Sequence, residues 1–252
     1  MTNRILITGG SGNLGRKIIE SNLFKNIYYP TSKQINILNV KKLKKFIKKN
    51  KINLIIHCAA LARMRECEKN IKKAIKTNIE GTLNVVNVIN SLNSRKKIRL
   101  IYISSDAVYS GTKGNYSETD ALEPFNVYGW TKMASEFIVK TLDKFLIIRT
   151  RFFNKDRILF KYSAKNIYTS TIEIKKLVII IYKLISKNTH GIINVGEKKR
   201  SDYNNYKKFK KEIKPCSKKK ILSGINFKIA TDASLNINKL NKILWRKLTM
   251  KS

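Results

Sequence analysis

A glycine-rich stretch close to the N-terminus, "ILITGGSGNLGRKI", constrains the fold more than any other part of the sequence. A strand-like run leads into Gly9, Gly12 and Gly15, and a helix-like segment follows. Glycines at this spacing allow a tight turn and a close approach of the backbone to a pyrophosphate, while the next helix offers free N–H groups. The stretch therefore predicts a dinucleotide-binding loop made by Gly9, Gly12, Asn13, Leu14 and Gly15.

Short apolar runs alternate with helix-length segments along most of the chain. The runs lack regular polar alternation, which is typical of strands buried on both faces of a parallel sheet. We predict an α/β fold with a Rossmann-type, doubly wound parallel sheet, whose strands place the ligand site at their carboxyl ends. The expected strands are Arg4–Thr8, Ile27–Tyr29, Leu54–Cys58, Leu100–Ser104, Phe145–Thr150 and Ile192–Val195. The expected helices cover residues 14–24, 40–50, 66–93, 127–142 and 172–187.

The character of the sequence changes after Gly196, where residues 197–220 are polar and dense in lysine. We predict an NAD(P)-binding domain over residues 1–196, with a substrate-lobe insertion near 152–170. Residues 197–252 are expected to form a small C-terminal substrate-binding lobe that folds on the ligand edge of the sheet.

The formal net charge of the 252 residues is +37. Such a charge can attract nucleic acid, anionic lipid or an anionic substrate such as a nucleotide sugar. The lysines are spread over nearly the whole chain beside many isoleucines and asparagines, and no nucleic-acid recognition motif accompanies them. We interpret the charge as a bias of genome composition and expect no specific nucleic-acid binding.

Three cysteines and two histidines are too few, and wrongly spaced, for a disulfide framework or a metal site. We therefore expect no metal and a reducing, cytoplasmic setting. The most apolar run, residues 177–185, is too short to span a bilayer and contains Lys183, and no targeting segment is visible. No membrane association is expected.

The stretch "YYPTSKQ", which follows the second predicted strand, bears on the choice between NAD and NADP. An acidic residue at this place would bind the ribose 2′-hydroxyl and select NAD. The stretch contains no carboxylate, whereas Arg16, Ser32 and Lys33 can receive a 2′-phosphate. We expect NADPH as the cofactor, with NADH as the open alternative.

A tyrosine lies four residues before a lysine in "YGWTK", a spacing that can build a proton donor for carbonyl reduction. Tyr128 and Lys132 share one face of the predicted helix, where the lysine cation can lower the pKa of the phenol. Four other pairs repeat the spacing, but Pro30 or Gly111 interrupts two of them and a lysine-rich surface segment holds the others. Only Tyr128 and Lys132 begin a helix after a strand that ends near Ser105, whose hydroxyl would hold the substrate oxygen.

Together these motifs resemble the extended short-chain dehydrogenase/reductase superfamily, and within it the dTDP-4-dehydrorhamnose reductase (RmlD-like) family. The resemblance runs in order over about the first 150 residues and continues more loosely beyond them. Its motifs are "TGGSGNLG", "HCAA", "TNIEGTLNV", "SSDAVYSG", "YSETD" and "YGWTK".

The resemblance also implies roles for particular residues. The catalytic set would be Ser105, Tyr128 and Lys132. Further cofactor contacts would come from Cys58, Ala59, Ala60, Asn78 and Lys132. Substrate contacts would come from Ser105, Asp106, Tyr128 and Phe153.

The activity that the resemblance implies is the NAD(P)H-dependent reduction of a 4-keto nucleotide sugar, with Tyr128 as the proton donor, for a deoxysugar of a surface polysaccharide. The stretch after "RTRFFNKD" is shorter than in the family, which leaves the sugar open. The alternatives are a nucleotide-sugar epimerase or dehydratase on the same scaffold, and a non-catalytic NAD(P)-binding regulatory subunit. The family also implies a homodimer through the helices at 66–93 and 127–142.

Overall fold

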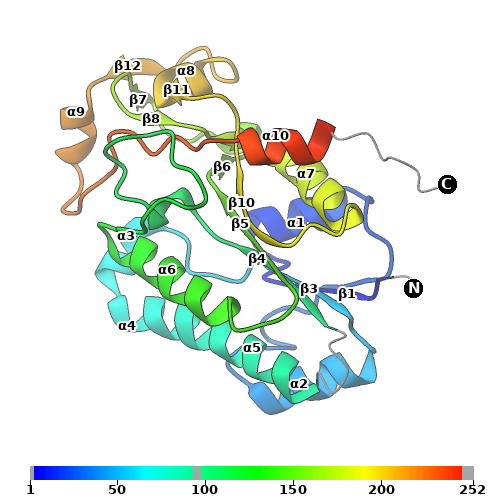
Figure 1. Cartoon of the computed structure of the whole chain (residues 1–252). Coiled ribbons are helices and arrows are strands. Elements are labelled where there is room, and N and C mark those ends of the chain that lie inside the picture. The colour runs from blue at the N-terminus through cyan, green and yellow to red at the C-terminus, as the bar shows by residue number, and fades with distance from the viewer. Residues whose placement is uncertain (1–2, 93–97, 246–252) are drawn as a thin grey trace.

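The computed structural model describes residues 3–92 and 98–245. Its central sheet consists of six parallel strands in the order β10-β5-β4-β3-β1-β2 (Figure 1). The strands are β1 (Ile5–Thr8), β2 (Ile27–Tyr28), β3 (Leu54–His57), β4 (Arg99–Ile103), β5 (Phe145–Thr150) and β10 (Gly191–Val195). The predicted strands and the parallel, Rossmann-type sheet are therefore confirmed.

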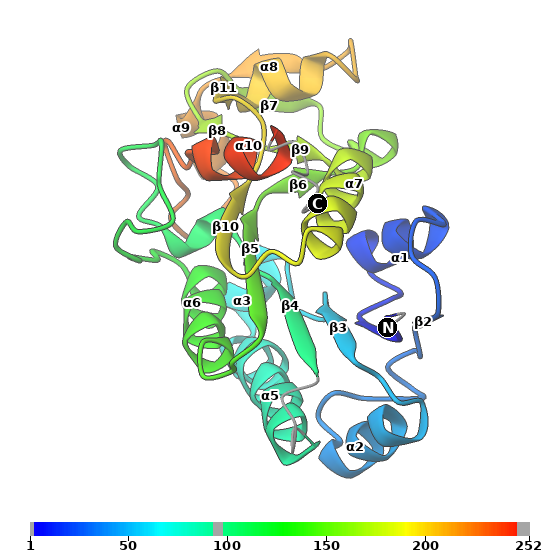
Figure 2. The same ribbon diagram turned by 45° about the vertical axis from the view of Figure 1, so that its right-hand side comes forward.

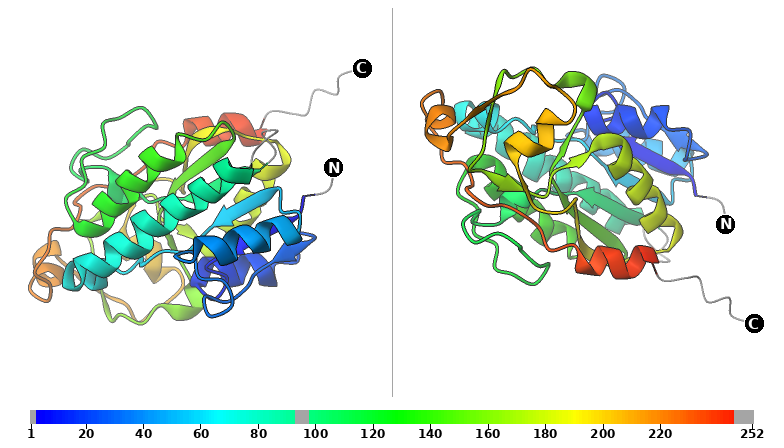
Figure 3. Two further views of the ribbon diagram at one scale, coloured as in Figure 1. Left: turned by 90° about the horizontal axis from the view of Figure 1, so that it is seen from below. Right: turned by 90° about the horizontal axis from the view of Figure 1, so that it is seen from above.

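Helices cover both faces of the sheet, as Figure 3 shows from below and from above. One face carries α1 (Asn13–Glu20), α7 (Ile174–Ser186) and α10 (Asn238–Trp245). The other face carries α2 (Val40–Lys49), α5 (Gly81–Leu92) and α6 (Val127–Val139). Successive residues of a strand point to opposite faces of the sheet. Ile101 of β4 therefore lies in the hydrophobic core on the side of α1, α7 and α10, and Leu100 lies in the core on the side of α2, α5 and α6. Within the described residues, no helix combines the length and hydrophobicity that crossing a bilayer requires.

The sheet has its topological switch point at β1, which pairs with β2 on one side and with β3 on the other. Ligands of open α/β sheets bind outside the carboxyl ends of the strands at such a point. Gly9 follows β1 there, and Cys58 follows β3. His57, at the end of β3, is only 1% exposed and its ring contacts the hydroxyls of Thr8 and Thr82 at 2.6 and 3.1 Å. Burial lowers the pKa of His57 to about 3, so this histidine is a neutral, hydrogen-bonded residue of the core.

The helix expected over residues 66–93 is interrupted. The segment divides into α3 (Met64–Lys69), α4 (Ile71–Ala74), a π-helical turn η1 (Ile75–Glu80) and α5. The break lies at Asn70, whose backbone leaves the helical region and whose side chain accepts from the N–H of Lys73 to start α4. Helix α1 also ends earlier than predicted, because Asn22 adopts a positive φ of 55°.

A lobe at one end of the molecule, at the top of Figure 1, combines two distant stretches of the chain. Strand β7 (Tyr162–Ala164) pairs with β12 (Lys214–Cys216), and β8 (Tyr168–Thr169) pairs with β11 (Arg200–Ser201). The remaining elements of this end are β6 (Phe152–Phe153), β9 (Ile172–Glu173), α8 (Asp202–Lys207) and α9 (Lys218–Leu222). Helix α10 returns to the sheet and packs beside β10 and α7, as Figure 2 shows. The predicted boundary at residue 196 stays a prediction.

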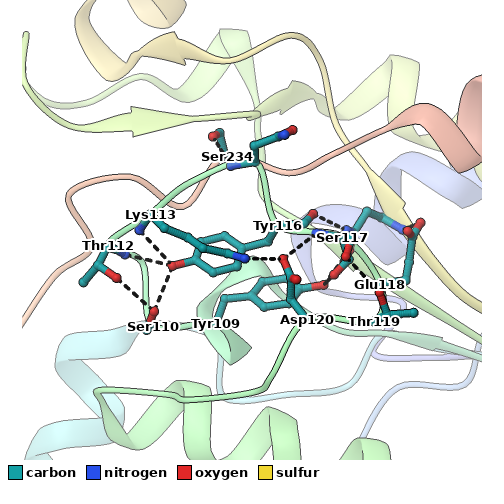
Figure 4. Close-up of polar contacts among 12 residues, drawn as sticks. Tyr109, Ser110, Thr112, Lys113, Tyr116, Ser117, Glu118, Thr119, Asp120 and Ser234 are labelled. Atoms are coloured by element: carbon teal, nitrogen blue, oxygen red, sulfur yellow. Dashed lines mark hydrogen bonds and ion pairs between the residues drawn. The ribbon is translucent and has the colours of Figure 1, made fainter.

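A loop between β4 and α6 ties the C-terminal part of the chain to the sheet (Figure 4). The ring of Tyr116 stacks on Tyr109 with 4.6 Å between the ring centroids, and its backbone pairs with Leu235. The hydroxyl of Tyr109 accepts from Arg149 at 2.7 Å, whereas Lys113 forms an ion pair with Asp120 at 3.0 Å. Tyr109 and Lys113 are therefore structural, although they repeat the tyrosine–lysine spacing.

Candidate active site

A cavity of about 350 Å³ lies at the carboxyl ends of β1, β3, β4 and β5. It brings the glycine loop together with the predicted catalytic set, from segments far apart in the sequence. The lining residues that the sequence analysis singled out are Gly9, Gly12, Asn13, Leu14, Gly15, Cys58, Ala60, Ser105, Asp106, Tyr128 and Lys132. Among the residues that the structure describes, no cluster of three or more His, Cys, Asp or Glu side chains is arranged to hold a metal ion.

The glycine loop has the shape that a pyrophosphate cradle needs. Gly9 has a φ of 71°, and a Cβ there would lie 2.7 Å from the backbone nitrogen of Ala59. At Gly15 a Cβ would collide with the carbonyl oxygen of Gly9. Gly12 precedes the first turn of α1, which contains no acidic side chain. The positive end of the α1 dipole and its free N–H groups therefore face the loop without a competing carboxylate.

A second cavity, also of about 350 Å³, adjoins the first and shares Gly9, Gly12, Cys58 and Ala60 with it. Ser32 and Ala59 line this cavity, but Lys33 does not. None of the described residues that line it is acidic. The two cavities therefore adjoin at the glycine loop, and the described lining of the second one lacks the carboxylate that would bind a free ribose 2′-hydroxyl.

Tyr128 and Ser105 both line the first cavity, where the Ser105 hydroxyl lies within hydrogen-bonding reach of the phenol. Desolvation raises the pKa of Tyr128 above its ordinary value, while the hydrogen bond with Ser105 acts in the opposite direction. The phenol is therefore protonated over the whole physiological range, which is the state that a proton donor needs.

Lys132 is 3% exposed, and burial lowers its pKa to about 7. Its ammonium group donates to the carbonyl oxygen of Ile103 at 2.7 Å and lies 4.0 Å from the centre of the Tyr102 ring. Desolvation is the largest effect on the phenol, so the pKa of Tyr128 is raised in this structure, and the lowering of that pKa by Lys132 stays a prediction. Lys132 nevertheless lines the same cavity one helical turn from Tyr128.

Two other predicted site residues lie outside both cavities. Asn78 is 1% exposed, and its amide bonds to the backbone of Leu61 and donates to Thr131 at 2.9 Å. It therefore braces the loop after β3 against α6. Phe153 packs on Tyr206 and lines a separate cavity of about 240 Å³ in the lobe. Its neighbour Phe152 lines the central cavity instead, because successive residues of an extended strand point to opposite sides.

The structure adds a residue that the sequence analysis missed. Arg151 lines the central cavity, and its Nε lies 2.6 Å from Oδ2 of Asp106. The motif "RTRFFNKD" contains no local signal for this contact, since the two partners are far apart along the chain. A second ion pair that the sequence did not reveal, Arg149 with Glu136 at 2.7 Å, is fully buried and ties β5 to α6.

A glycine loop at the switch point of a parallel, doubly wound sheet, opening on a cavity that a tyrosine and a lysine share, defines the class of Rossmann-type nucleotide-binding proteins. Within this class the chain belongs to the family described as RmlD substrate binding domain, which matches residues 3–170. The resemblance that the sequence motifs indicated is thereby confirmed.

Curated relatives and solved structures agree with this family. A dTDP-4-dehydrorhamnose reductase of Aggregatibacter actinomycetemcomitans is 32% identical over 58% of this chain and 50% of its own. The methionine adenosyltransferase 2 subunit beta of Bos taurus is 32% identical over 53% of this chain and 41% of its own. The chain thus spans about half the length of the curated relatives it matches. The crystal structure of dTDP-4-dehydrorhamnose reductase from Bacillus anthracis in complex with NADP has a TM-score of 0.84 and 25% identity, covering 96% of this chain and 93% of that one.

Proposed function

We propose that the chain is an NADPH-dependent reductase of a 4-keto nucleotide sugar, with Tyr128 as the proton donor. The observation that carries the proposal is the single cavity that holds the glycine loop beside Ser105, Tyr128 and Lys132. The family and the reductases among the relatives support the same substrate class. The product would be a deoxysugar for a surface polysaccharide.

The chemistry follows from the positions of the side chains. Bound NADPH would supply the hydride for the carbonyl carbon of the sugar. Tyr128 would give its hydroxyl proton to the carbonyl oxygen, and Ser105 would hold that oxygen by a hydrogen bond. Lys132, whose pKa burial lowers to about 7, would bind the cofactor. In its protonated form it would also stabilise the phenolate that the transfer leaves.

The glycine loop and its surroundings fit a dinucleotide. The backbone at Gly9 and Gly15 leaves no room for side chains, and Gly12 opens onto both cavities. The absence of an acidic residue among the described lining of the second cavity, together with Ser32 in it, favours NADPH over NADH. The NADP complex of the Bacillus anthracis reductase supports the same choice.

The test is a turnover assay with purified protein, 4-keto nucleotide sugars and either cofactor. We expect oxidation of NADPH that depends on the sugar. The kcat/KM with NADPH should be at least about tenfold above that with NADH, because NADH lacks the 2′-phosphate and the loss of its contact costs about 1.4 kcal/mol or more. Lack of sugar-dependent oxidation with every 4-keto nucleotide sugar would refute the reductase proposal. A dinucleotide that stays bound through purification and is recycled would favour an epimerase.

A second candidate is a non-catalytic, nucleotide-binding subunit of another enzyme. The relatives named methionine adenosyltransferase 2 subunit beta favour it. The intact set of Ser105, Tyr128 and Lys132 in one cavity argues against it. Tight NADPH binding without turnover of any keto sugar would decide for the subunit.

We further propose a homodimer through α5 and α6, which lie side by side on one face (Figure 3). Trp130 and Phe137 lie two turns apart on the same face of α6 and are 53% and 55% exposed, and Leu83 of α5 is 40% exposed, so a dimer through this face would cover these side chains. A solution mass twice that of the chain, reduced to the monomer mass by Phe137→Lys, is expected in analytical ultracentrifugation. A monomeric wild-type protein at high concentration would refute the dimer.

A further inference from the structure

Arg151 lies at the boundary between the catalytic cavity and another cavity of about 350 Å³ in the lobe. Only Arg151 and Met64 line both among the described residues. The side chain of Arg151 is 25% exposed and leaves the chain directly after β5, one residue before Phe152. A substrate that reaches from Tyr128 toward the lobe would therefore pass this arginine.

The guanidinium of Arg151 is connected to the candidate catalytic serine through one intermediate residue. Its Nε lies 2.6 Å from Oδ2 of Asp106, a side chain that is 2% exposed. The other carboxylate oxygen of Asp106 accepts the hydroxyl hydrogen of Ser105 at 3.1 Å. The backbone N–H of Ala107 donates to the same Ser105 hydroxyl at 3.2 Å. The direction of the Ser105 hydroxyl is thus set by Asp106, and the position of Asp106 is set by Arg151.

The charged and titratable groups around Asp106 come from four elements. Ser105 and Asp106 follow β4, Tyr128 lies on α6, Arg151 follows β5, and Asp202 and Tyr206 of α8 face the guanidinium from the lobe. Burial raises the pKa of Asp106, and Arg151 acts in the opposite direction. Arg151 is the cation in this group, so its removal would leave the buried carboxyl group of Asp106 and the partly buried one of Asp202 without this counter-charge.

We propose that Arg151 is a positioning residue, which holds Asp106 in place and thereby aims the hydroxyl of Ser105 at the reacting oxygen. The inference rests on the proposed reductase function. In the resting enzyme the Ser105 hydrogen points to Asp106, and it must turn to the substrate oxygen during the reaction. The ion pair makes Asp106 a weaker acceptor, because its charge is shared with the guanidinium, and this lowers the cost of that turn.

The role predicts a pH dependence with a definite sign. In Arg151→Met, Asp106 loses its counter-charge, so its pKa rises further and the carboxyl group takes up a proton at a higher pH than in the wild type. Below that pKa a neutral Asp106 competes weakly for the Ser105 hydrogen. Above it, an unpaired carboxylate retains the hydrogen. The ratio of variant to wild-type kcat should therefore be highest at acidic pH and fall as the pH rises.

The experiment compares kcat and KM of Arg151→Met, Arg151→Lys and the wild type across the pH range. We expect Arg151→Met to lose about 100-fold in kcat at alkaline pH, the size of the effect of a misplaced catalytic group, with a smaller change in KM. Arg151→Lys keeps the charge and should restore most of kcat and the flat pH ratio. The control Arg200→Met removes an arginine whose partner Glu197 lies 3.7 Å away at the lobe surface, and it should leave kcat unchanged. A loss in Arg151→Met that is equal at every pH, or one confined to KM, would overturn the proposal.

Two further measurements keep the result decisive. If Arg151→Met does not fold, Asp106→Asn is compared with the double variant Asp106→Asn/Arg151→Met, which lacks both charges. If Arg151 acts through Asp106, kcat of the double variant should be less than about threefold below that of Asp106→Asn alone. A larger additional loss of kcat would show that Arg151 acts independently of Asp106. If the wild type reduces no keto sugar, the proposed function fails, and crystal structures of the variants decide the positioning role. Unmoved Asp106 and Ser105 side chains in Arg151→Met would then refute it, and displacement restored by Arg151→Lys would support it.

Discussion

Replacement of Tyr128 by phenylalanine is expected to lower kcat by about 10²–10⁴-fold, the range in which a positioned general acid contributes. The variant removes one hydroxyl and keeps the ring, so the lining of the cavity is preserved. NADPH binding, measured by calorimetric titration, should change by less than about twofold, because the phenol acts on the reacting carbonyl and not on the cofactor's phosphates. Turnover is measured with the 4-keto sugar that the wild-type protein reduces.

The matched control for this variant is Tyr203→Phe. Tyr203 repeats the tyrosine–lysine spacing on α8, where Lys207 donates to its hydroxyl at 2.7 Å on the exposed surface of the lobe. Its loss should leave kcat unchanged, since neither residue lines the candidate active site. Wild-type turnover in Tyr128→Phe would show that another group supplies the proton.

Gly12→Val is expected to weaken NADPH binding by at least about 100-fold, which corresponds to the loss of a close pyrophosphate contact of about 3 kcal/mol. Gly12 is exposed and lines both cavities, and the nearest atom to a Cβ at this place is the Gly9 oxygen at 3.2 Å. This tight contact moves the loop by a few tenths of an ångström, and the added side chain would point into the space proposed for the phosphates. The melting temperature, measured without cofactor, should stay close to that of the wild type.

Gly224→Val serves as the control for an added valine. Gly224 lies in the lobe, and the nearest heavy atom to a Cβ there, the carbonyl oxygen of Ile221, is 3.9 Å away, which is an ordinary van der Waals contact. Its NADPH affinity should equal that of the wild type. An unchanged dissociation constant in Gly12→Val would place the dinucleotide elsewhere and contradict the proposed role of the glycine loop.

The sheet could be predicted from the sequence because buried parallel strands have a local signature. The run that forms β4 is apolar on both faces, and Leu100 and Ile101 enter different cores. The glycine loop was equally legible, since close backbone contacts at Gly9 and Gly15 exclude every other residue type. Both the apolar strand pattern and the glycine spacing can be recognised within a few residues, although the contact that excludes a side chain at Gly9 comes from the distant Ala59.

Structural features that depend on contacts between distant residues could not be predicted from the sequence. The break at Asn70 lies inside a continuous helical pattern, so the sequence predicted one long helix. Which of Phe152 and Phe153 lines the central cavity depends on how a two-residue strand is oriented. A strand this short has no hydrophobic periodicity from which its orientation could be predicted. The ion pair of Asp106 with Arg151 joins the ends of two adjacent strands, and only the strand order brings them together.

The lobe has a consequence for how substrate preference can change in such a scaffold. Its β-pairs join residues 162–164 to 214–216 and 168–169 to 200–201, while Tyr116 binds the backbone at Leu235. In the proposed reductase, the surface of the lobe that would bind the sugar is therefore not one contiguous segment that recombination could exchange between relatives. A chimera that replaced residues 197–252 alone would pair β11 and β12 of one parent with β8 and β7 of the other. Functional exchange, in evolution or in the laboratory, has to move both segments together.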